Sequence, residues 1–264
     1  RIFQMNHPRG STGYHNSIKY NPVTGESEQS PNTLGLPSDT QLSGFKYDAL
    51  EIYNGKRTED IPEVFEDWLS LLAQGIHIAG TGTSDSHQSG SYPGAARTYV
   101  WIGEGLDDPS TIQEKDLREG VLSGQTLVVG GPFVEAWLLP LDEENGTPSR
   151  VGQVQHATGT TAQLRVRIQA PSWMPVDEIE IWKNQELALS QSIGAPNAES
   201  QIVRLDQSFD ISVEQDSFFV VVAKSSSVPR PYLKDQIISF AGPLFLNMDG
   251  DESYTAPGLL EPEP

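Results

Sequence analysis

The sequence has 264 residues and contains no cysteine. Disulfide bonds, thiolate metal ligands and a cysteine nucleophile are therefore excluded, and any bound metal ion must be held by histidine and carboxylate side chains. The missing cysteines and the acidic, polar composition favour a periplasmic or secreted bacterial protein over a cytosolic one.

Basic residues are scarce, since 17 Lys and Arg stand against 36 Asp and Glu and give a formal net charge of −19. A polyanion would be repelled by such a surface, so we expect no nucleic-acid partner. No apolar run approaches the roughly 18 residues of a membrane-spanning helix, so we expect no membrane span. The first five residues lack a signal-peptide pattern and read as a strand without an initiating Met, so we expect upstream sequence, either removed or in a separate chain.

Up to about Leu127 the pattern alternates strands with helices, which predicts a first domain over residues 1–127 of α/β type. Ile61, Phe65, Trp68 and Leu72 recur at helical spacing, and Gly75 follows as a stop signal. A second helix is predicted over 110–123, with Thr111 and Glu114 as its capping box. The predicted strands are residues 2–5, 47–53 and 76–79.

A long polar stretch, residues 9–43, is rich in Gly, Ser, Asn and Pro. An irregular insert of that length in a compact domain is typical of an active-site loop or lid, so we expect it to shape a substrate pocket.

Beyond residue 127 only strand-like runs and turns occur, which predicts an all-β second domain over residues 128–264. Leu164, Val166 and Ile168 alternate with polar residues, and Ile179 and Ile181 repeat that alternation. Short strands at this spacing indicate an immunoglobulin-like antiparallel β-sandwich. The predicted strands are residues 126–129, 133–139, 163–168, 179–181, 187–189, 202–205, 218–222 and 237–240, with a turn at 183–185.

Polar residues of metal-binding type lie at or just past the ends of the first three predicted strands. His7 follows residues 2–5, Glu51 and Asn54 end the next strand, and Asp85 and His87 follow the third. The carboxyl ends of parallel strands meet at one edge of a sheet, so these side chains could converge there. Imidazole and carboxylate suit a divalent ion, and Asp85 and His87, two residues apart in an extended loop, point the same way.

This pattern resembles the PHP (polymerase and histidinol phosphatase) metal-dependent hydrolases, in the branch that includes the carbaryl hydrolases. The matching segments are Asn6-His7-Pro8 and residues 49–55, 82–87, 97–100, 123–126, 131–133 and 247–258. The resemblance implies the C-terminal part of a distorted (β/α) barrel that binds two or three zinc, manganese or iron ions. It also implies hydrolysis of a small molecule's phosphoester, ester or carbamate bond by a metal-activated water.

The resemblance assigns roles to single residues. His7, Asp85 and His87 match the later metal ligands, and Asp85 would also orient the attacking water. Glu51 and Asn54 would stand beside the metals, facing the substrate, and Arg97 would contact an anionic substrate. The family's opening His-x-His pair should precede His7 and has no counterpart here, so we expect those ligands from an N-terminal barrel fragment, in another chain or upstream.

Each of these residues also has a structural interpretation, because a single His or Asp in a fold is more often hydrogen-bonded than ligating. His15 is expected to be solvated, His77 to be packed within a strand against a helix, and His156 to lie in a sandwich turn. Residues 249–252 could hold calcium but are expected to form a solvated turn.

Trp173, Trp182 and Tyr232 could stack on carbohydrate but more commonly pack. Asn145-Gly146-Thr147 fits the glycosylation acceptor pattern, but glycosylation there requires a eukaryotic secretory origin, which nothing in the sequence supports. The competing hypothesis to a hydrolase is a non-enzymatic binding or structural component, in which the sandwich mediates association and the barrel site is incomplete.

Overall fold

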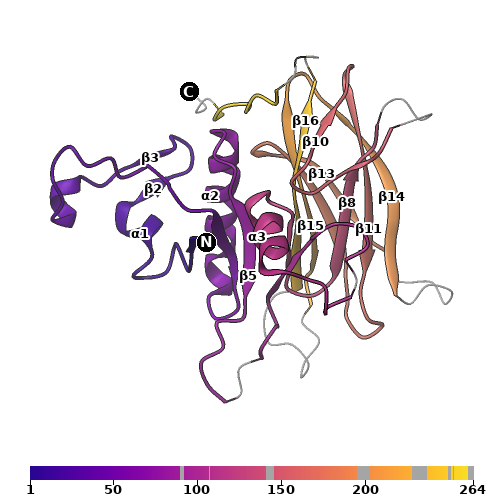
Figure 1. The fold of residues 1–264 in the computed structure, drawn as a ribbon, viewed down its shortest axis with the longest axis horizontal. Helices are drawn as coiled ribbons and strands as arrows, with labels where there is room; N and C mark the ends of the chain where they lie inside the picture. The colour runs from indigo at the N-terminus through magenta and orange to yellow at the C-terminus, as the bar shows by residue number, and fades with distance from the viewer. Residues whose placement is uncertain are drawn as a thin grey trace.

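The computed structural model describes residues 1–89, 92–106, 108–140, 146–194, 202–227, 237–248, 251 and 253–260, and it is mostly β with few helices (Figure 1). The helices are α1 Tyr14–Ile18, α2 Ile61–Ala73 and α3 Glu114–Leu122, with 3-10 turns at Pro31–Leu34 and Thr58–Asp60. The strands of the first half are β1 Gln4–Met5, β2 Tyr20–Asn21, β3 Glu26–Ser27, β4 Ala49–Asn54, β5 Ala79–Thr83, β6 Arg97–Val100 and β7 Thr126–Val129. Those of the second half are β8 Phe133–Leu138, β9 Ser149–Arg150, β10 Val154–His156, β11 Thr161–Gln169, β12 Glu178–Lys183, β13 Glu186–Ser192, β14 Val203–Ser212, β15 Ser217–Ser225 and β16 Ile237–Asn247.

A small parallel sheet in the order β1-β4-β5 carries the candidate site. All six residues of β4 are buried, as expected for the central strand of a parallel sheet covered on its faces. The third strand begins at Ala79, three residues later than the sequence pattern predicts. The preceding carbonyl, that of Ile78, accepts a hydrogen bond of 2.8 Å from the indole of Trp68, so it serves the helix rather than the sheet.

Helix α2 follows its predicted pattern closely. Its apolar positions are buried, and Trp68 is completely so. The helix ends in a Schellman motif: Gly75 adopts φ +79°, its N–H donates to the carbonyl of Leu72, and the N–H of Ile76 donates to that of Leu71. The predicted stop at Gly75 is confirmed.

Two larger sheets, one of seven strands and one of four, pack face to face. Their orders are β13-β12-β15-β16-β7-β6, with β10 beside β16, and β14-β11-β8-β9. Nearly all pairings are antiparallel; β10 with β16 is parallel. Alternate residues of β8 and β11 point inward, which confirms the predicted alternation, and they share one apolar core with residues of β12, β15 and β16. Asn184 and Gln185 form the predicted turn between β12 and β13, with Asn184 at φ +57°.

The other face of the seven-stranded sheet packs against α2. The ring of Phe65 lies 5.4 Å from that of Trp182 on β12 and 5.1 Å from that of Phe240 on β16. Figure 1 shows α2 between the two large sheets and the α1–β3 region. The molecule is therefore layered, and the apolar core around α2 joins the small parallel sheet to the β-sandwich.

The small sheet also touches the edge of the seven-stranded sheet. The N–H of Gly82 on β5 donates to Oγ1 of Thr98 on β6, and the hydroxyl of Thr126 on β7 donates to the carbonyl of Gly80. Strand β6, from the predicted first domain, thus lies in the same sheet as strands of the second. Among the described residues the three parallel strands do not close into a barrel.

Helix α3 begins later than predicted, at Glu114 rather than near residue 110. Its capping box consists of Gln113 and Asp116: the carboxylate of Asp116 accepts the N–H of Gln113 at 2.8 Å. The predicted pair Thr111 and Glu114 is wrong because residues 108–111 form a separate turn, in which the N–H of Thr111 donates to the carbonyl of Asp108.

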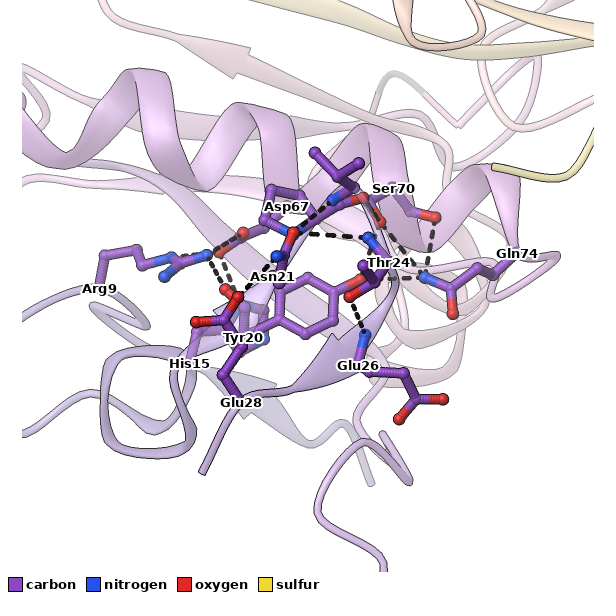
Figure 2. Close-up of polar contacts among 12 residues, drawn as sticks. Arg9, His15, Tyr20, Asn21, Thr24, Glu26, Glu28, Asp67, Ser70 and Gln74 are labelled. Carbon is purple, nitrogen blue, oxygen red and sulfur yellow. Dashed lines mark hydrogen bonds and ion pairs between the residues drawn. The ribbon is translucent and has the colours of Figure 1, made fainter. Parts of the chain in front are cut away.

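The insert over residues 9–43 is held against the outer side of α2 by a buried polar network (Figure 2). Asp67 of α2 accepts a hydrogen bond of 2.7 Å from Nε of Arg9, and Nδ1 of His15 lies 2.7 Å from the same carboxylate. The hydroxyl of Tyr20 lies 2.9 Å from that of Ser70 one turn further on. The insert is thus tied to the helix through the buried side chains of His15 and Tyr20 and through the partly buried side chain of Arg9.

Candidate functional site

The candidate site lies at the carboxyl ends of β1, β4 and β5. Because these strands are parallel neighbours, the segments that follow them leave the sheet at the same edge. His7 follows β1, Asn54 ends β4, and Asp85 and His87 follow β5. Glu51, within β4, lies between the other two strands.

Glu51 is the centre of the hydrogen bonds at this edge, and its side chain is buried. Its Oε2 accepts the backbone N–H of His7 at 2.5 Å and the side-chain N–H of Asn54 at 3.0 Å. Its Oε1 accepts the hydroxyl of Thr83 at the end of β5. One carboxylate therefore ties the segments after β1 and β5 to β4 and fixes their relative positions.

His7 combines two features of a functional residue. Its backbone adopts φ +37°, which is uncommon for a residue other than glycine and costs conformational energy unless the surroundings hold it. Its ring atom Nδ1 is buried and has no hydrogen-bond partner. An unpaired buried polar atom costs free energy, so Nδ1 is free to bind a metal ion through its lone pair or to accept a hydrogen bond from a ligand.

Asp85 and His87 contact each other. Nδ1 of His87 lies 2.9 Å from Oδ1 of Asp85 and 2.7 Å from its carbonyl oxygen, and Asp85 adopts φ +47°. The ammonium group of Lys56 lies 3.0 Å from the same ring nitrogen. The ring of His87 is largely exposed, and its Nδ1 position is already shared among these neighbours.

Arg97, expected to contact an anionic substrate, has other contacts in this structure. Its Nη1 donates to the carbonyl of Gly94 at 2.6 Å, its Nε lies 3.3 Å from the hydroxyl of Tyr99, and its guanidinium lies over the Tyr99 ring. These contacts hold the side chain along β6.

The residues present fit part of a metal centre. His7 offers an unpartnered nitrogen, and Asp85 and His87 form a carboxylate–imidazole pair. No group of three or more His, Asp or Glu side chains in the described ranges is placed to hold a metal ion. A zinc or manganese site needs more ligands than this edge of the sheet supplies.

Lys56 and Thr83 are contacts that the sequence analysis missed. Both lie within the segments it selected, after β4 and at the end of β5. Their positions in the sequence could have identified them, because polar residues that end or follow neighbouring parallel strands lie at the same edge of the sheet.

The expectation that His15 is solvated is wrong. His15 is completely buried, with Nδ1 near Asp67 and Nε2 lying 2.6 Å from the hydroxyl of Tyr47. Burial also raises the pKa of Tyr47 well above its usual range, which keeps this phenol protonated. The insert is polar in composition, so the sequence did not indicate that some of its side chains, such as Ile18 and Tyr20, are packed in the interior.

Two other histidines differ from expectation. His77 precedes β5 instead of lying within a strand, and its ring stacks on Phe245 with centroids 4.6 Å apart. His156 lies at the end of β10 rather than in a turn, because residues 154–156 pair with β16.

The remaining sequence candidates add no further site. Trp182 packs against Phe65, and its indole donates to Glu180, whereas Trp173 is half exposed. Tyr232, Asn145 and three of residues 249–252 lie outside the described residues. Asp251 accepts the backbone N–H of Ser253 at 2.7 Å.

The described part of the chain has no helix with the length and apolarity that a membrane crossing requires. Comparison with known proteins found no matching family model, no matching curated protein and no matching solved structure.

Proposed function

We propose that this chain carries part of the active site of a metal-dependent hydrolase of the PHP type, which cleaves a phosphoester, ester or carbamate bond of a small molecule. In this proposal residues 1–127 are the C-terminal part of a distorted barrel, and residues 128–264 are an immunoglobulin-like domain. The parallel order β1-β4-β5, with ligand-type residues after each strand, supports it.

The observation that carries the proposal is the environment of His7. Glu51 accepts the backbone N–H of His7 and the hydroxyl of Thr83, so the loops after β1 and β5 are held together. The same arrangement leaves Nδ1 of His7 buried without a partner. A structural histidine would pair that atom, whereas a ligating histidine needs its nitrogen free of other bonds.

Each residue then has a defined task. His7, Asp85 and His87 would hold zinc, manganese or iron ions, and Glu51 and Asn54 would position them from behind. A bound divalent ion supplies a water of lowered pKa and stabilises negative charge on the oxygen of the scissile group. Asp85 would accept a proton from the attacking water, Lys56 and Arg97 would attract an anionic substrate, and the insert would border the pocket.

The remaining ligands would come from an N-terminal barrel fragment, in a separate chain or in upstream sequence. Two observations support this part of the proposal. The described residues hold no set of three ligands, and among the strands that they form β1 pairs with β4 alone. An unpaired strand edge next to an incomplete site is suited to pairing with another strand.

Metal analysis tests the proposal. The protein is purified together with any upstream sequence or associated polypeptide and dialysed against Zn²⁺ or Mn²⁺. Bound metal is then measured by mass spectrometry, and hydrolysis of p-nitrophenyl phosphate and p-nitrophenyl acetate is assayed. We expect bound metal and hydrolysis in the wild type, and loss of both in His7→Ala and His87→Ala. His156→Ala, on the exposed strand β10, is the matched control and should behave as the wild type.

If the wild type purified with its N-terminal barrel strands is metal-free, or if both variants of it retain metal, the proposal is contradicted. The second candidate is a non-enzymatic binding component, favoured by the missing third ligand. It predicts a metal-free protein whose oligomeric state is unchanged by His7→Ala. Intact-mass measurement and peptide mapping of the sample show whether a second polypeptide is associated.

A further inference from the structure

A pocket outside the candidate metal site lies between β6–β7 and the outer face of β8. Its volume is about 240 Å³, and its lining includes Tyr99, Trp101, Phe133, Trp137 and Arg150. This space suits a ligand the size of a single ring, since pockets for larger ligands begin at roughly 300 Å³.

The walls of the pocket are aromatic because of the period of β8. Val134, Ala136 and Leu138 point into the sandwich core, which places Phe133 and Trp137 on the outer face. Tyr99 of β6 meets Phe133 edge to face with ring centroids 5.1 Å apart. Tyr99 and Trp101 are 43% and 37% exposed, so two of the aromatic side chains that line the pocket keep surface that a ligand could cover.

Arg150 gives the pocket its charge. It lies opposite Trp137 in the β8–β9 register, and its guanidinium carbon lies 4.4 Å from the Trp101 ring centroid and 5.7 Å from that of Trp137. Within the described ranges, Arg150 forms no ion pair with a carboxylate, although the chain has 36 acidic residues. The neighbouring Arg165, by contrast, pairs with Asp206 at 3.1 Å.

Glu135 also lines the pocket, but its position limits its influence on a ligand. It stands opposite Arg167 in the β8–β11 register, where the positive charge of Arg167, which also pairs with Asp206 at 4.0 Å, lies between Glu135 and a second carboxylate. Arg150 lies on β9, which pairs with β8 on the side away from β11. Its guanidinium group lies over the indole rings of Trp101 and Trp137.

From these contacts we infer that the pocket binds a small planar aromatic carboxylate. The ring would lie against Trp101, Phe133 and Tyr99, and the carboxylate would accept two hydrogen bonds from Arg150. A guanidinium on aromatic faces is matched to such an anion by geometry and charge. A quaternary ammonium or amine is disfavoured, because Arg150 already provides the positive charge of the aromatic cluster.

Ligand-detected NMR and tryptophan fluorescence test the inference with three probes of one shape: benzoate, neutral benzamide and cationic benzylamine. We expect benzoate to bind most tightly, and Arg150→Met to weaken benzoate by about tenfold or more, as for a lost charge-assisted contact. The same variant should leave benzamide nearly unchanged. Trp101→Ala should weaken both ligands, and Arg118→Met on α3 is the matched control.

Three results would overturn the inference: no benzoate binding to the wild type, equal affinity for benzoate and benzamide, or unchanged benzoate affinity in Arg150→Met. Circular dichroism and urea unfolding check that each variant is folded. If Trp101→Ala does not fold, Trp101→Phe keeps a ring and should retain benzoate binding at reduced affinity. The pocket is independent of the proposed metal site, so its failure leaves that proposal unaffected.

Discussion

The backbone N–H of His7 donates a hydrogen bond of 2.5 Å to Oε2 of Glu51, a residue 44 positions later in the chain. Glu51 also accepts the hydroxyl of Thr83, so one buried carboxylate connects the loops after β1 and β5. Both oxygens of Glu51 accept hydrogen bonds, and of these neighbours only the hydroxyl of Thr83 could also accept one from a side-chain amide.

Glu51→Gln should therefore destabilise the protein. The amide that replaces the carboxylate carries no negative charge, so the hydrogen bonds from His7 and Asn54 would no longer be charge-assisted, and the hydroxyl of Thr83 would have to turn to accept the NH₂. We expect this change to lower the free energy of unfolding by roughly 1–3 kcal/mol. Urea denaturation measures the change, and Glu66→Gln on the exposed side of α2 should lie within about 0.5 kcal/mol of the wild type. Equal stability of the two variants would show that Glu51 does not hold this edge together.

Asp67→Asn should be more damaging. Arg9 and His15 both contact the buried carboxylate of Asp67. Replacing this carboxylate with an amide would leave the guanidinium of Arg9 without its counter-charge. We expect a loss of about 3–5 kcal/mol in unfolding free energy and faster proteolysis within residues 9–43. Asp39→Asn, on the exposed part of the insert, is the control. An intact, protease-resistant Asp67→Asn insert would mean that other contacts hold it.

Gly13→Ala tests the turn that carries His7. A Cβ atom at Gly13 would lie 2.2 Å from the carbonyl oxygen of Pro8 and 2.3 Å from that of His7, so the backbone must shift. We expect a loss of roughly 1–3 kcal/mol in unfolding free energy, measured by urea denaturation. Gly44→Ala is the matched control, because its nearest contact is an ordinary 3.7 Å to Gln41. A Gly13→Ala protein as stable as Gly44→Ala would show that the turn adapts freely.

His77 should make stability depend on pH. His77 stacks on Phe245 and is partly desolvated there although it stays exposed to solvent, and this desolvation lowers its pKa below the ordinary value of 6.5. The unfolded chain therefore binds a proton more readily than the folded one. The folded state is favoured when His77 is neutral. This contribution of His77 to the free energy of unfolding is fully present above pH 6.5 and is lost as the pH falls toward the pKa of His77 in the folded state. His77→Phe keeps the ring stack and should flatten this part of the curve.

Urea unfolding of the wild type and of His77→Phe, from about pH 5 to about pH 8, measures the difference. Subtracting the two curves removes the contributions of groups that both proteins share. A wild type that gains stability relative to His77→Phe on acidification would contradict the assigned direction of the pKa shift.

Local patterns predicted those elements whose environment is regular. The spacing of Ile61, Phe65, Trp68 and Leu72 identified α2, and the alternation in residues 163–168 identified the inward face of β11. Both succeed because a helix or strand with one apolar side has only one way to bury it. The end of α2 was also predictable, since Gly75 alone there adopts a left-handed backbone without cost.

The predictions failed where a distant residue decides the environment. His15 looked solvated because its neighbours in sequence are polar, but Asp67 and Tyr47, 52 and 32 positions away, bury and satisfy it. Similarly, β5 starts later than predicted because the carbonyl of Ile78 accepts a hydrogen bond from the indole of Trp68. Neither partner can be inferred from periodicity.

The sequence by itself determined that α2 is a helix, that β8 and β11 are strands with one apolar side, and that polar residues follow the ends of β1, β4 and β5. Tertiary structure alone decided that Glu51 binds both adjoining loops, that His7 keeps a buried unpaired nitrogen, and that Arg150 rests on two indoles. The physical reason is that apolar periodicity is a property of neighbours along the chain. Hydrogen-bond partners and ring contacts depend on which residues the packed layers bring together.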